Sequence, residues 1–263
     1  MEKKYLAPSV SSAVNIVNLL SKYRYSEATL TEISNEVNVN NSTCYRILHT
    51  LVEKKILIHN KETKKFSLGP YLMILGKRAN ELIGYVDIAK TYLSKIGELT
   101  NATCGIVQRV ENRWTYMEKY IPDSPYSISI KVGQSFDLTA GATGKLLMAY
   151  LSTEEQEEKI KNIGIKKYTS KTEISKEGYL NNLEKVYEQG FSISNEEHYE
   201  GILGLSFPVF NSLEEVEFGF TVIMLNNKKK ERVNEIAYQI KAITDELSMI
   251  ISSNSENKEK EIL

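Results

Sequence analysis

Residues 29 to 58 contain two short helical patterns, a polar turn between them and a β-branched run after them. The first pattern begins at Thr29, which can cap a helix while Glu32 bonds back to it as a capping box. In the second pattern, apolar residues recur at helical spacing and predict one buried stripe about a hundred degrees wide. These residues are Cys44, Ile47, Leu48, Leu51 and Val52. The arrangement predicts a helix-turn-helix, in which the second helix enters the major groove of DNA.

The predicted outward face of the second helix carries side chains that can bond bases or phosphates. They are Ser42, Thr43, Tyr45, Arg46, His49 and Thr50. Because the N-terminal half of a recognition helix lies deepest in the groove, we expect the first four to make the closer DNA contacts. Arg46 is the first candidate for reading a base.

A β-hairpin is predicted directly after the second helix, with strands at 56–59 and 65–68 around a polar turn. Such a hairpin would be the wing of a winged helix-turn-helix. Lys61, Lys64 and Lys65 lie where a wing follows the sugar-phosphate backbone, so we expect them to add affinity and salt dependence but little sequence preference.

Two helices joined by a polar turn also occur in ordinary protein cores, and charged faces are usually just solvated. The charge distribution favours the DNA-binding interpretation. Residues 1–80 contain 12 Lys and Arg against 6 Asp and Glu, whereas residues 81–263 contain 21 against 28. The basic part of the chain therefore coincides with the motif.

The composition, with 41% hydrophobic and 25% charged residues in 263, is that of a globular chain of one large or two modest domains. No apolar run is long enough for a membrane helix, and the N-terminus lacks the apolar stretch of a signal peptide. We therefore expect a cytoplasmic protein with no membrane partner. Cys, His and carboxylate residues do not cluster at ligand spacing, which predicts no metal site and no cofactor.

A single linker helix is predicted to start at Pro70. Its apolar residues are Tyr71, Leu72, Ile74, Leu75, Ala79 and Leu82. This helix is apolar enough to pair with a second copy of the chain, although a helix covered within one chain would have the same pattern. Before the motif, a first helix is predicted at 9–23, capped by Ser9, with a buried face formed by Val10, Ala13, Val14, Val17 and Leu20.

From residue 86 the pattern predicts strand pairs separated by helices, which favours an α+β fold with an antiparallel sheet covered by helices. Strands are expected at 103–110, 113–120, 126–130, 191–195, 202–210 and 216–225, and a long helix at 230–252. The predicted domains are a winged helix-turn-helix at 1–69, a linker helix at 70–85, a C-terminal domain at 86–252 and a polar tail at 253–263.

The segment Gly141-Ala142-Thr143-Gly144-Lys145 is similar to the end of a nucleotide-binding P-loop, but Thr139 replaces its first glycine and Leu146 its Ser or Thr. A helix start remains, which either binds a small anion or simply packs closely. Glu196, Glu197 and His198 adjoin one another, yet no nucleophile, base and orienting group assemble around them. The sequence therefore does not predict an enzyme.

Three segments together resemble the IclR-type bacterial transcriptional regulators, over about residues 10–250. The first is NSTCYRILHTLVEKKILI with KKFSLGPYLMILG, the second LTAGATGKLLMAYL, and the third GFSISNEEHYEGILGLSFPVF followed by FGFTVIML. The resemblance implies a winged helix that binds operator DNA as a homodimer, often as a dimer of dimers. It also implies a C-terminal GAF-like domain that binds a small metabolite, commonly an organic acid or an aromatic compound, in a repressor or an activator.

Carried over by position, the effector site would comprise Thr143, Gly144, Glu196, Glu197, Leu203, Gly204, Thr221 and Ile223. Gly141, Gly204 and Ile223 replace the threonine, cysteine and serine of some acid-binding members, so fewer polar partners are expected. Because a buried anion needs several donors, a larger or less polar effector is as compatible with the sequence as an organic acid. Two other functions stay open: a DNA-binding dimer without effector, and a DNA-tethered enzyme.

Overall fold

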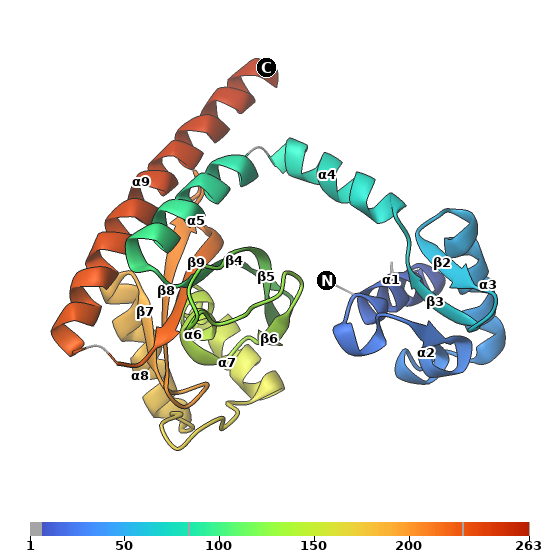
Figure 1. Ribbon diagram of the computed structural model, residues 1–263, viewed down its shortest axis with the longest axis horizontal. Coiled ribbons are helices and arrows are strands. Elements are labelled where there is room, and N and C mark those ends of the chain that lie inside the picture. Colours follow the sequence, from blue (N-terminus) through green and yellow to red (C-terminus); the bar gives the residue numbers. More distant parts are fainter. Residues whose placement is uncertain (1–6, 84, 228, 263) are drawn as a thin grey trace. The chain divides into compact units, whose positions relative to one another are not determined.

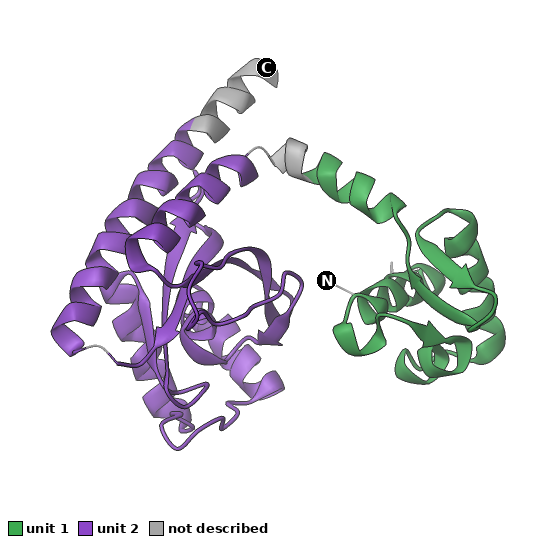
Figure 2. Ribbon diagram, in the orientation of Figure 1, with its two compact units in different colours: residues 1–84 green, residues 85–263 purple. Residues whose placement is uncertain are grey.

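The computed structural model describes residues 7–83, 85–227 and 229–262, except for the side chains of 80–83 and 254–262. The chain divides into two compact units, residues 1–84 and 85–263 (Figures 1 and 2). Gly84, at the end of the predicted linker, and Leu263, at the end of the predicted tail, lie outside the described residues. The first unit has one hydrophobic core and the second unit has two.

The first unit is a winged helix-turn-helix followed by a long helix. Its elements are α1 (Pro8–Leu20), a 3-10 turn η2 (Tyr23–Tyr25), β1 (Ala28–Thr29), α2 (Leu30–Glu36), α3 (Asn41–Glu53), β2 (Leu57–Asn60), β3 (Lys65–Leu68) and α4 (Tyr71–Ile83). The three strands form an antiparallel sheet in the order β1-β3-β2. Strand β1 was not predicted, because two residues are too few for a recognisable alternation.

The predicted capping box is confirmed at the start of α2. The backbone N–H of Thr29 donates to Glu32 Oε2 at 2.7 Å, and the Glu32 N–H donates to Thr29 Oγ1 at 3.4 Å. Between the helices, Asn38 adopts a left-handed conformation with φ 52°, which asparagine tolerates well. Asn40 then caps α3 by accepting a bond from Thr43 N–H at 2.9 Å. These local bonds fix the sharp turn between α2 and α3.

The buried stripe of α3 is confirmed, while that of α1 is corrected. Cys44 and Leu48 are fully buried, with Ile47, Leu51 and Val52 packed against the same core. In α1 the buried residues are Ile16, Leu19 and Leu20, whereas Val10 and Val14 are 62% and 52% exposed. The helix also starts after Ala7 with Pro8 in its first turn, so Ser9 is not its cap. Of the predicted face, Leu20 is buried as expected and Ala13 and Val17 are half-buried, so α1 reaches the core mainly through its C-terminal end.

The second unit is a six-stranded antiparallel sheet with helices on both faces, which confirms the α+β prediction. Its strands are β4 (Thr103–Val110), β5 (Arg113–Tyr120), β6 (Ser135–Asp137), β7 (Ser192–Asn195), β8 (Ile202–Phe210) and β9 (Val216–Leu225), in the order β6-β5-β4-β9-β8-β7. Its helices are α5 (Val86–Thr100), α6 (Gly141–Ala149), α7 (Thr153–Ile163), α8 (Lys176–Gln189) and α9 (Lys230–Ile262).

Each face of this sheet has its own core. On one face α9 packs over β8 and, beside it, α5 packs over β4 and β5, with Leu93, Phe207, Phe220 and Ile240 in the core between helices and sheet. On the other face lie α6, α7 and α8, with Leu146, Met148 and Leu183 in the core. Helix α6 is buried on all sides from Ala142 to Ala149, which makes it the central element of this layer.

Two predictions for the second unit are wrong. Residues 126–130 form no strand; instead the short strand β6 pairs with the first residues of β5. Helix α9 continues to Ile262, where a polar tail was predicted from residue 253. In the part of the chain that the structure describes, no helix is long and apolar enough to cross a membrane. Nor do three or more metal-ligating side chains gather within those residues.

Candidate functional site

The predicted DNA-facing side chains lie on the outer surface of α3. Ser42, Tyr45, Arg46 and His49 are exposed, and Thr43 is half-buried beside the N-terminal turn. The Tyr45 and His49 rings are in contact, with centroids 4.2 Å apart. The N-terminal half of α3 thus presents donors and acceptors from four side chains on one surface, which is the chemistry that base edges and phosphates require.

The wing also forms where it was predicted. Strands β2 and β3 pair antiparallel, with His59 opposite Phe66 and Asn60 opposite Lys65. Lys61 and Lys64 are exposed in the turn, and Lys64 has a positive φ of 56°. The Asn60 side chain accepts bonds from the N–H groups of Glu62 and Thr63 and so holds the turn. Lys65 begins β3 and is half-buried, between Asn60 on β2 and Thr29 on β1.

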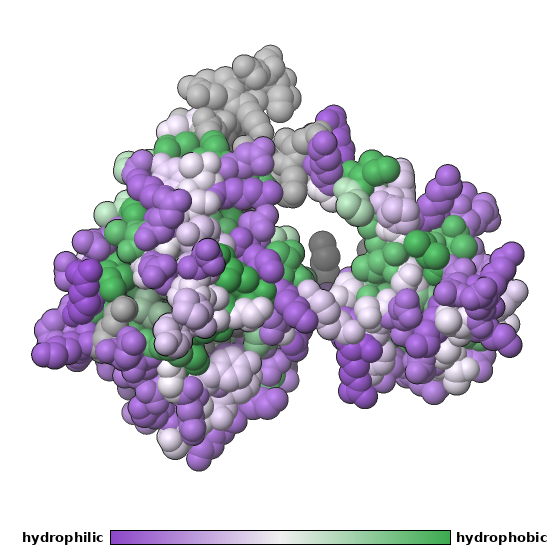
Figure 3. Space-filling view, in the orientation of Figure 1, coloured by the Kyte–Doolittle hydropathy of each residue, from purple (hydrophilic) through white to green (hydrophobic). Residues whose placement is uncertain are grey.

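Apolar side chains are exposed on two helices of the first unit. On α4, Met73 is 78% and Ile74 63% exposed, and on α1 Val10 and Val14 are exposed as noted above. Figure 3 shows hydrophobic surface on the described part of α4, among hydrophilic residues. Exposed apolar patches of this kind mark protein interaction surfaces.

The second unit encloses a cavity of about 330 Å³ between α6, the sheet and two loops. The size is in the range of small-ligand pockets. Four of the predicted effector-site residues line it: Thr143 on α6, Gly204 on β8, and Thr221 and Ile223 on β9. The other lining residues are Trp114, Tyr116, Ile128, Ser129, Ile130, Gln134, Phe136, Gly141, Ala142, Ser194, His198, Tyr199 and Ile202.

A chain of buried hydroxyl groups connects α6 to the sheet at the cavity. Thr143 Oγ1 and Ser206 Oγ are 3.0 Å apart, and Ser206 Oγ donates to Thr221 Oγ1, also at 3.0 Å. Thr221 Oγ1 in turn donates to the Leu205 carbonyl at 3.2 Å. Because each hydroxyl has a partner, two of the cavity's polar groups are held in fixed positions without a ligand.

The N-terminus of α6 opens on the cavity. Gly141 has a φ of 64°, and Ala140 precedes it as the N-cap. Alanine has no side-chain acceptor for the first N–H groups of the helix, which have no partner within the helix itself. Ala142 and Thr143 line the cavity, so an oxygen atom of a bound molecule could accept these bonds.

Aromatic rings form one wall of the cavity. Trp114 stacks on Phe136 with centroids 4.5 Å apart, and its Nε1–H donates to the Ala140 carbonyl. His198 meets Phe136 edge to face at 5.3 Å and Tyr168 at 4.4 Å. None of the described lining residues is Lys, Arg, Asp or Glu. The cavity therefore offers flat apolar surface with a few hydroxyl, amide and imidazole groups.

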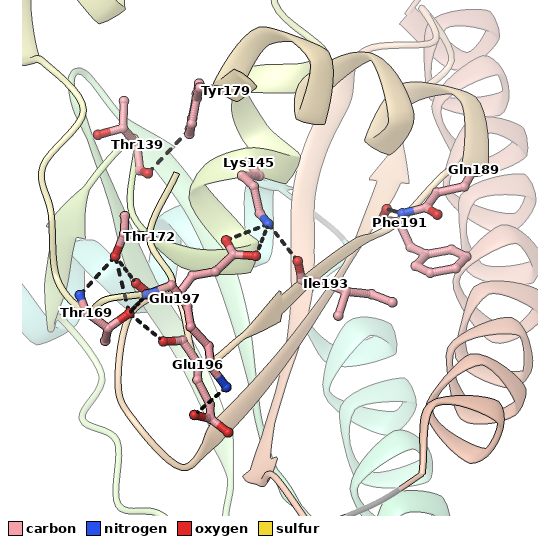
Figure 4. Close-up of polar contacts among 11 residues, drawn as sticks. Thr139, Lys145, Thr169, Thr172, Tyr179, Gln189, Phe191, Ile193, Glu196 and Glu197 are labelled. Carbon is pink, nitrogen blue, oxygen red and sulfur yellow. Dashed lines mark hydrogen bonds and ion pairs between the residues drawn. The ribbon is translucent and has the colours of Figure 1, made fainter. Parts of the chain in front are cut away.

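The remaining four predicted residues lie away from the cavity, each for a specific reason. Leu203 alternates with Gly204 on β8 and is buried in the core on the opposite face of the sheet. A Cβ added to Gly144 would meet the Leu138 carbonyl oxygen, so this glycine packs against backbone. Glu196 pairs with Lys171, and Glu197 pairs with the buried Lys145 (Figure 4).

The aromatic residues of the wall were missed by the sequence analysis. Trp114 and Tyr116 occupy alternate positions of β5 and so share one face of the sheet, a pattern that was visible in the sequence. The pattern alone indicates a buried face and not a cavity. Phe136 and His198 could not have been added from spacing, because they come from separate loops and strands.

Burial lowers the pKa of His198 to about 4; nearby Asp137 acts in the opposite direction and Lys166 in the same one. Above its ordinary pKa of 6.5 the imidazole is neutral in both the folded and the unfolded chain. Between pH 6.5 and about pH 4 the imidazole is protonated in the unfolded chain but still neutral in the folded one. The free energy of unfolding therefore falls as the pH falls through this range. Because solvent partly screens this half-buried group, we expect the free energy of unfolding to fall by only about 1–2 kcal/mol.

The single tryptophan, Trp114, reports unfolding of this unit in urea by its fluorescence. We expect that His198→Gln loses about 1–2 kcal/mol less than the wild type between about pH 7 and about pH 4.5. If the free energy of unfolding fell by the same amount in the two proteins, burial would not lower the pKa of His198 as described.

Comparisons with known proteins place both units of the chain in one family. Residues 9–58 match the family described as "IclR helix-turn-helix domain", and residues 81–249 match "Bacterial transcriptional regulator IclR C-terminal". The chain is 30% identical over 217 residues to the HTH-type transcriptional regulator KdgR of Escherichia coli (strain K12), covering 81% of this chain and 82% of KdgR.

Solved structures agree. An IclR transcriptional regulator from Alicyclobacillus acidocaldarius is 30% identical with a TM-score of 0.84, covering 93% of this chain and 99% of that one. An IclR homolog from Microbacterium hydrocarbonoxydans, complexed with 4-hydroxybenzoate, is 16% identical with a TM-score of 0.77 over 92% of this chain and 99% of that one, and so shares the fold. The chain therefore belongs to the IclR family of bacterial transcriptional regulators, with an N-terminal DNA-binding domain and a C-terminal effector-binding domain.

Proposed function

We propose that this regulator binds operator DNA as a homodimer through α3 and the wing, and that a small molecule in the 330 Å³ cavity changes this binding. The observation that carries the proposal is the cavity itself. It is lined by Thr143, Gly204, Thr221 and Ile223, four of the eight residues on which the family resemblance places the effector.

The surface of α3 supports the DNA contacts. Arg46 and Ser42 are exposed on its N-terminal half, with Tyr45, Thr43 and His49 around them. The wing lysines Lys61, Lys64 and Lys65 supply positive charge for the backbone. In this proposal the helix selects sequence and the wing adds affinity that depends on salt.

The exposed apolar residues support a dimer. Met73 and Ile74 on α4, and Val10 and Val14 on α1, are more than half exposed in a single chain. A second copy would cover such residues in an isologous interface, which presents the same patch from both subunits. Two recognition helices would then face half-sites about one helical turn apart, or a multiple of it.

The cavity favours a small effector with a flat ring. Trp114, Tyr116 and Phe136 provide surface for stacking, and the backbone N–H groups at the α6 N-terminus provide donors for an oxygen. The Microbacterium homolog binds a molecule of this kind, 4-hydroxybenzoate. Since no charged side chain lines the described cavity, a phenol or another neutral ring fits as well as an acid.

The effector acts through populations in this proposal. A bound molecule shifts the dimer between two arrangements of its DNA-binding domains only by as much as its affinity for the two differs. Operator affinity then changes by at most that affinity ratio. The change can be an increase or a decrease, so the proposal fits a repressor as well as an activator.

Filling the cavity tests the proposal. A Cβ on Gly204 would lie 3.5 Å from Ala142 Cβ and 3.7 Å from Ser194 Cβ, so Gly204→Leu extends into the cavity. We expect Gly204→Leu to bind operator as the wild type does, because the DNA-binding unit is unchanged. It should lose the response to any ring compound that shifts wild-type operator binding in a gel-shift screen of small phenols and aromatic acids.

Gly204→Ala is the matched control, since one methyl group makes only ordinary contacts and should keep the response. If Gly204→Leu responded as the wild type does, the effector would bind elsewhere. If no compound shifted operator binding, the constitutive DNA-binding dimer would be the better hypothesis.

A further inference from the structure

The loop between β7 and β8, residues 196–201, forms part of the cavity wall. His198 and Tyr199 line the cavity, while Glu196 and Glu197, immediately before them, make polar contacts outside it. Figure 4 shows these two carboxylates directed to different partners. His198 and Tyr199 therefore depend for their position at the wall on the contacts that hold this loop.

Glu197 anchors this loop to α6 through a buried ion pair. Its Oε2 lies 2.6 Å from Lys145 Nζ and its Oε1 2.7 Å from the same nitrogen. Lys145 Nζ also donates to the Ile193 carbonyl on β7 at 2.7 Å. The ammonium therefore binds three oxygen atoms, which is the number of protons it can donate.

The exposure of the two groups makes this pair different from the surface pairs nearby. The Lys145 side chain is 7% exposed and that of Glu197 24%. Removing one partner of a buried pair leaves the other charge desolvated and unpaired, which costs far more than breaking a surface pair. The nearby Lys171 and Glu196 pair differs at its lysine, whose side chain is 52% exposed, whereas the Glu196 side chain, at 21%, is exposed about as much as that of Glu197.

A second row of bonds reaches the same loop from the segment before α8. Thr169 Oγ1 donates to the Glu196 carbonyl at 2.7 Å, and Thr172 Oγ1 donates to the Glu197 carbonyl at 2.6 Å (Figure 4). Glu196 itself has a φ of 61°, which is unfavourable for a residue with a side chain. The loop therefore adopts a conformation that its neighbours impose through specific hydrogen bonds.

His198 follows Glu197 directly, so the anchor limits where the imidazole can lie. The ring is enclosed by Phe136 and Tyr168 and by its own neighbour Tyr199, 4.4 Å away. The charged and titratable groups that act on it are Asp137 on β6 and Lys166 before α8. A loop released from Lys145 would carry His198 and Tyr199 away from this enclosure.

We propose that Lys145 and Glu197 are positioning residues of the effector cavity, whose buried ion pair holds the 196–201 loop in place with His198 and Tyr199 at the cavity wall. The pair does this from outside the cavity, without touching the bound molecule. The inference rests on the proposed function only in taking this cavity as the effector site. It accounts for Glu197 being part of the family-like segment although it does not line the cavity.

The test needs neither effector nor DNA. The chain has three histidines, so the His198 resonances can be followed by NMR as the pH is varied in wild type, Glu197→Gln and Lys145→Met. We expect both variants to raise the pKa of His198 from about 4 by about one unit or more, because the loosened ring gains water. Acrylamide should also quench Trp114 more strongly, since this side chain lines the same cavity.

Lys171→Met is the matched control, because it removes a lysine from the exposed pair of the same network. It should leave both signals as in the wild type. Loss of stability alone would not move the titration of the folded state, so the pKa readout separates positioning from a general structural role.

Thr172→Val is used if the charge variants unfold, since it leaves no buried charge; it removes the donor to the Glu197 carbonyl and the acceptor of the Tyr168 and Thr169 N–H groups. It should raise the pKa of His198 by a smaller amount. Folded Glu197→Gln or Thr172→Val with wild-type His198 titration and quenching would overturn the positioning role. That result would not affect the proposed function, which stands or falls on the Gly204→Leu measurement.

Discussion

Arg46→Ala is expected to weaken binding to the operator by about 10- to 100-fold, which corresponds to about 1–3 kcal/mol, and to relax base preference at one position. Arg46 is exposed on the N-terminal half of α3, where a recognition helix meets base edges. A guanidinium can donate two parallel bonds to guanine, and alanine can donate none. Binding to a selected operator and to fragments with each base substituted measures both effects.

Lys64→Ala is the control for this prediction. Lys64 is exposed at the tip of the wing, where a charge neutralises a phosphate but does not select a base. The variant should weaken all sequences alike and reduce the slope of log affinity against log salt by about one. Equal loss on every fragment for both variants would contradict the division between a reading helix and an anchoring wing.

Local chemistry made the DNA-binding unit predictable from sequence. Thr29 and Glu32 are three residues apart and form the capping box, and the α3 stripe from Cys44 to Val52 is buried as predicted. Such features depend on neighbours within one or two helical turns. The exposure of Val10 and Val14 could not be predicted in the same way, because it depends on how far the remainder of the unit extends along α1.

The error at residues 126–130 has a tertiary cause. Tyr126, Ile128 and Ile130 alternate as a strand would, and the last two do face the cavity. Their carbonyl groups, however, accept bonds from the side chains of Thr103 and Lys119 instead of pairing with another strand. The alternation indicated the burial of one face correctly, but not the backbone partner.

For the cavity, the sequence predicted the elements better than the contacts. The helix start at Thr143 and strands β8 and β9 do meet there, as the resemblance implied. The partner of Glu197 is Lys145, 52 residues earlier in the chain, and only the fold brings the two together. Since Glu196 and Glu197 are adjacent, the sequence suggested one role for both, whereas the structure gives them separate ion pairs.

Gly144→Ala should lower the free energy of unfolding of the C-terminal unit by about 2–3 kcal/mol, as overpacking in a buried site does. The added Cβ would lie 2.4 Å from the Leu138 carbonyl oxygen and 2.9 Å from the Thr139 carbonyl carbon. Both are backbone atoms, which cannot move aside as a flexible side chain could. Urea unfolding followed by Trp114 fluorescence measures the change.

Gly204→Ala is the comparison, because its Cβ would make only ordinary contacts with Ala142 and Ser194. We expect it to stay within about 1 kcal/mol of the wild type, helped by the lower entropy of its unfolded chain. If Gly144→Ala were as stable as the wild type, the backbone would not require glycine at this position. Direct contact with the effector, as the family resemblance implies, would then be the better account of why glycine stands there. A destabilised Gly144→Ala instead means that this glycine lets α6 approach residues 138–139, while its neighbour Thr143 lines the cavity.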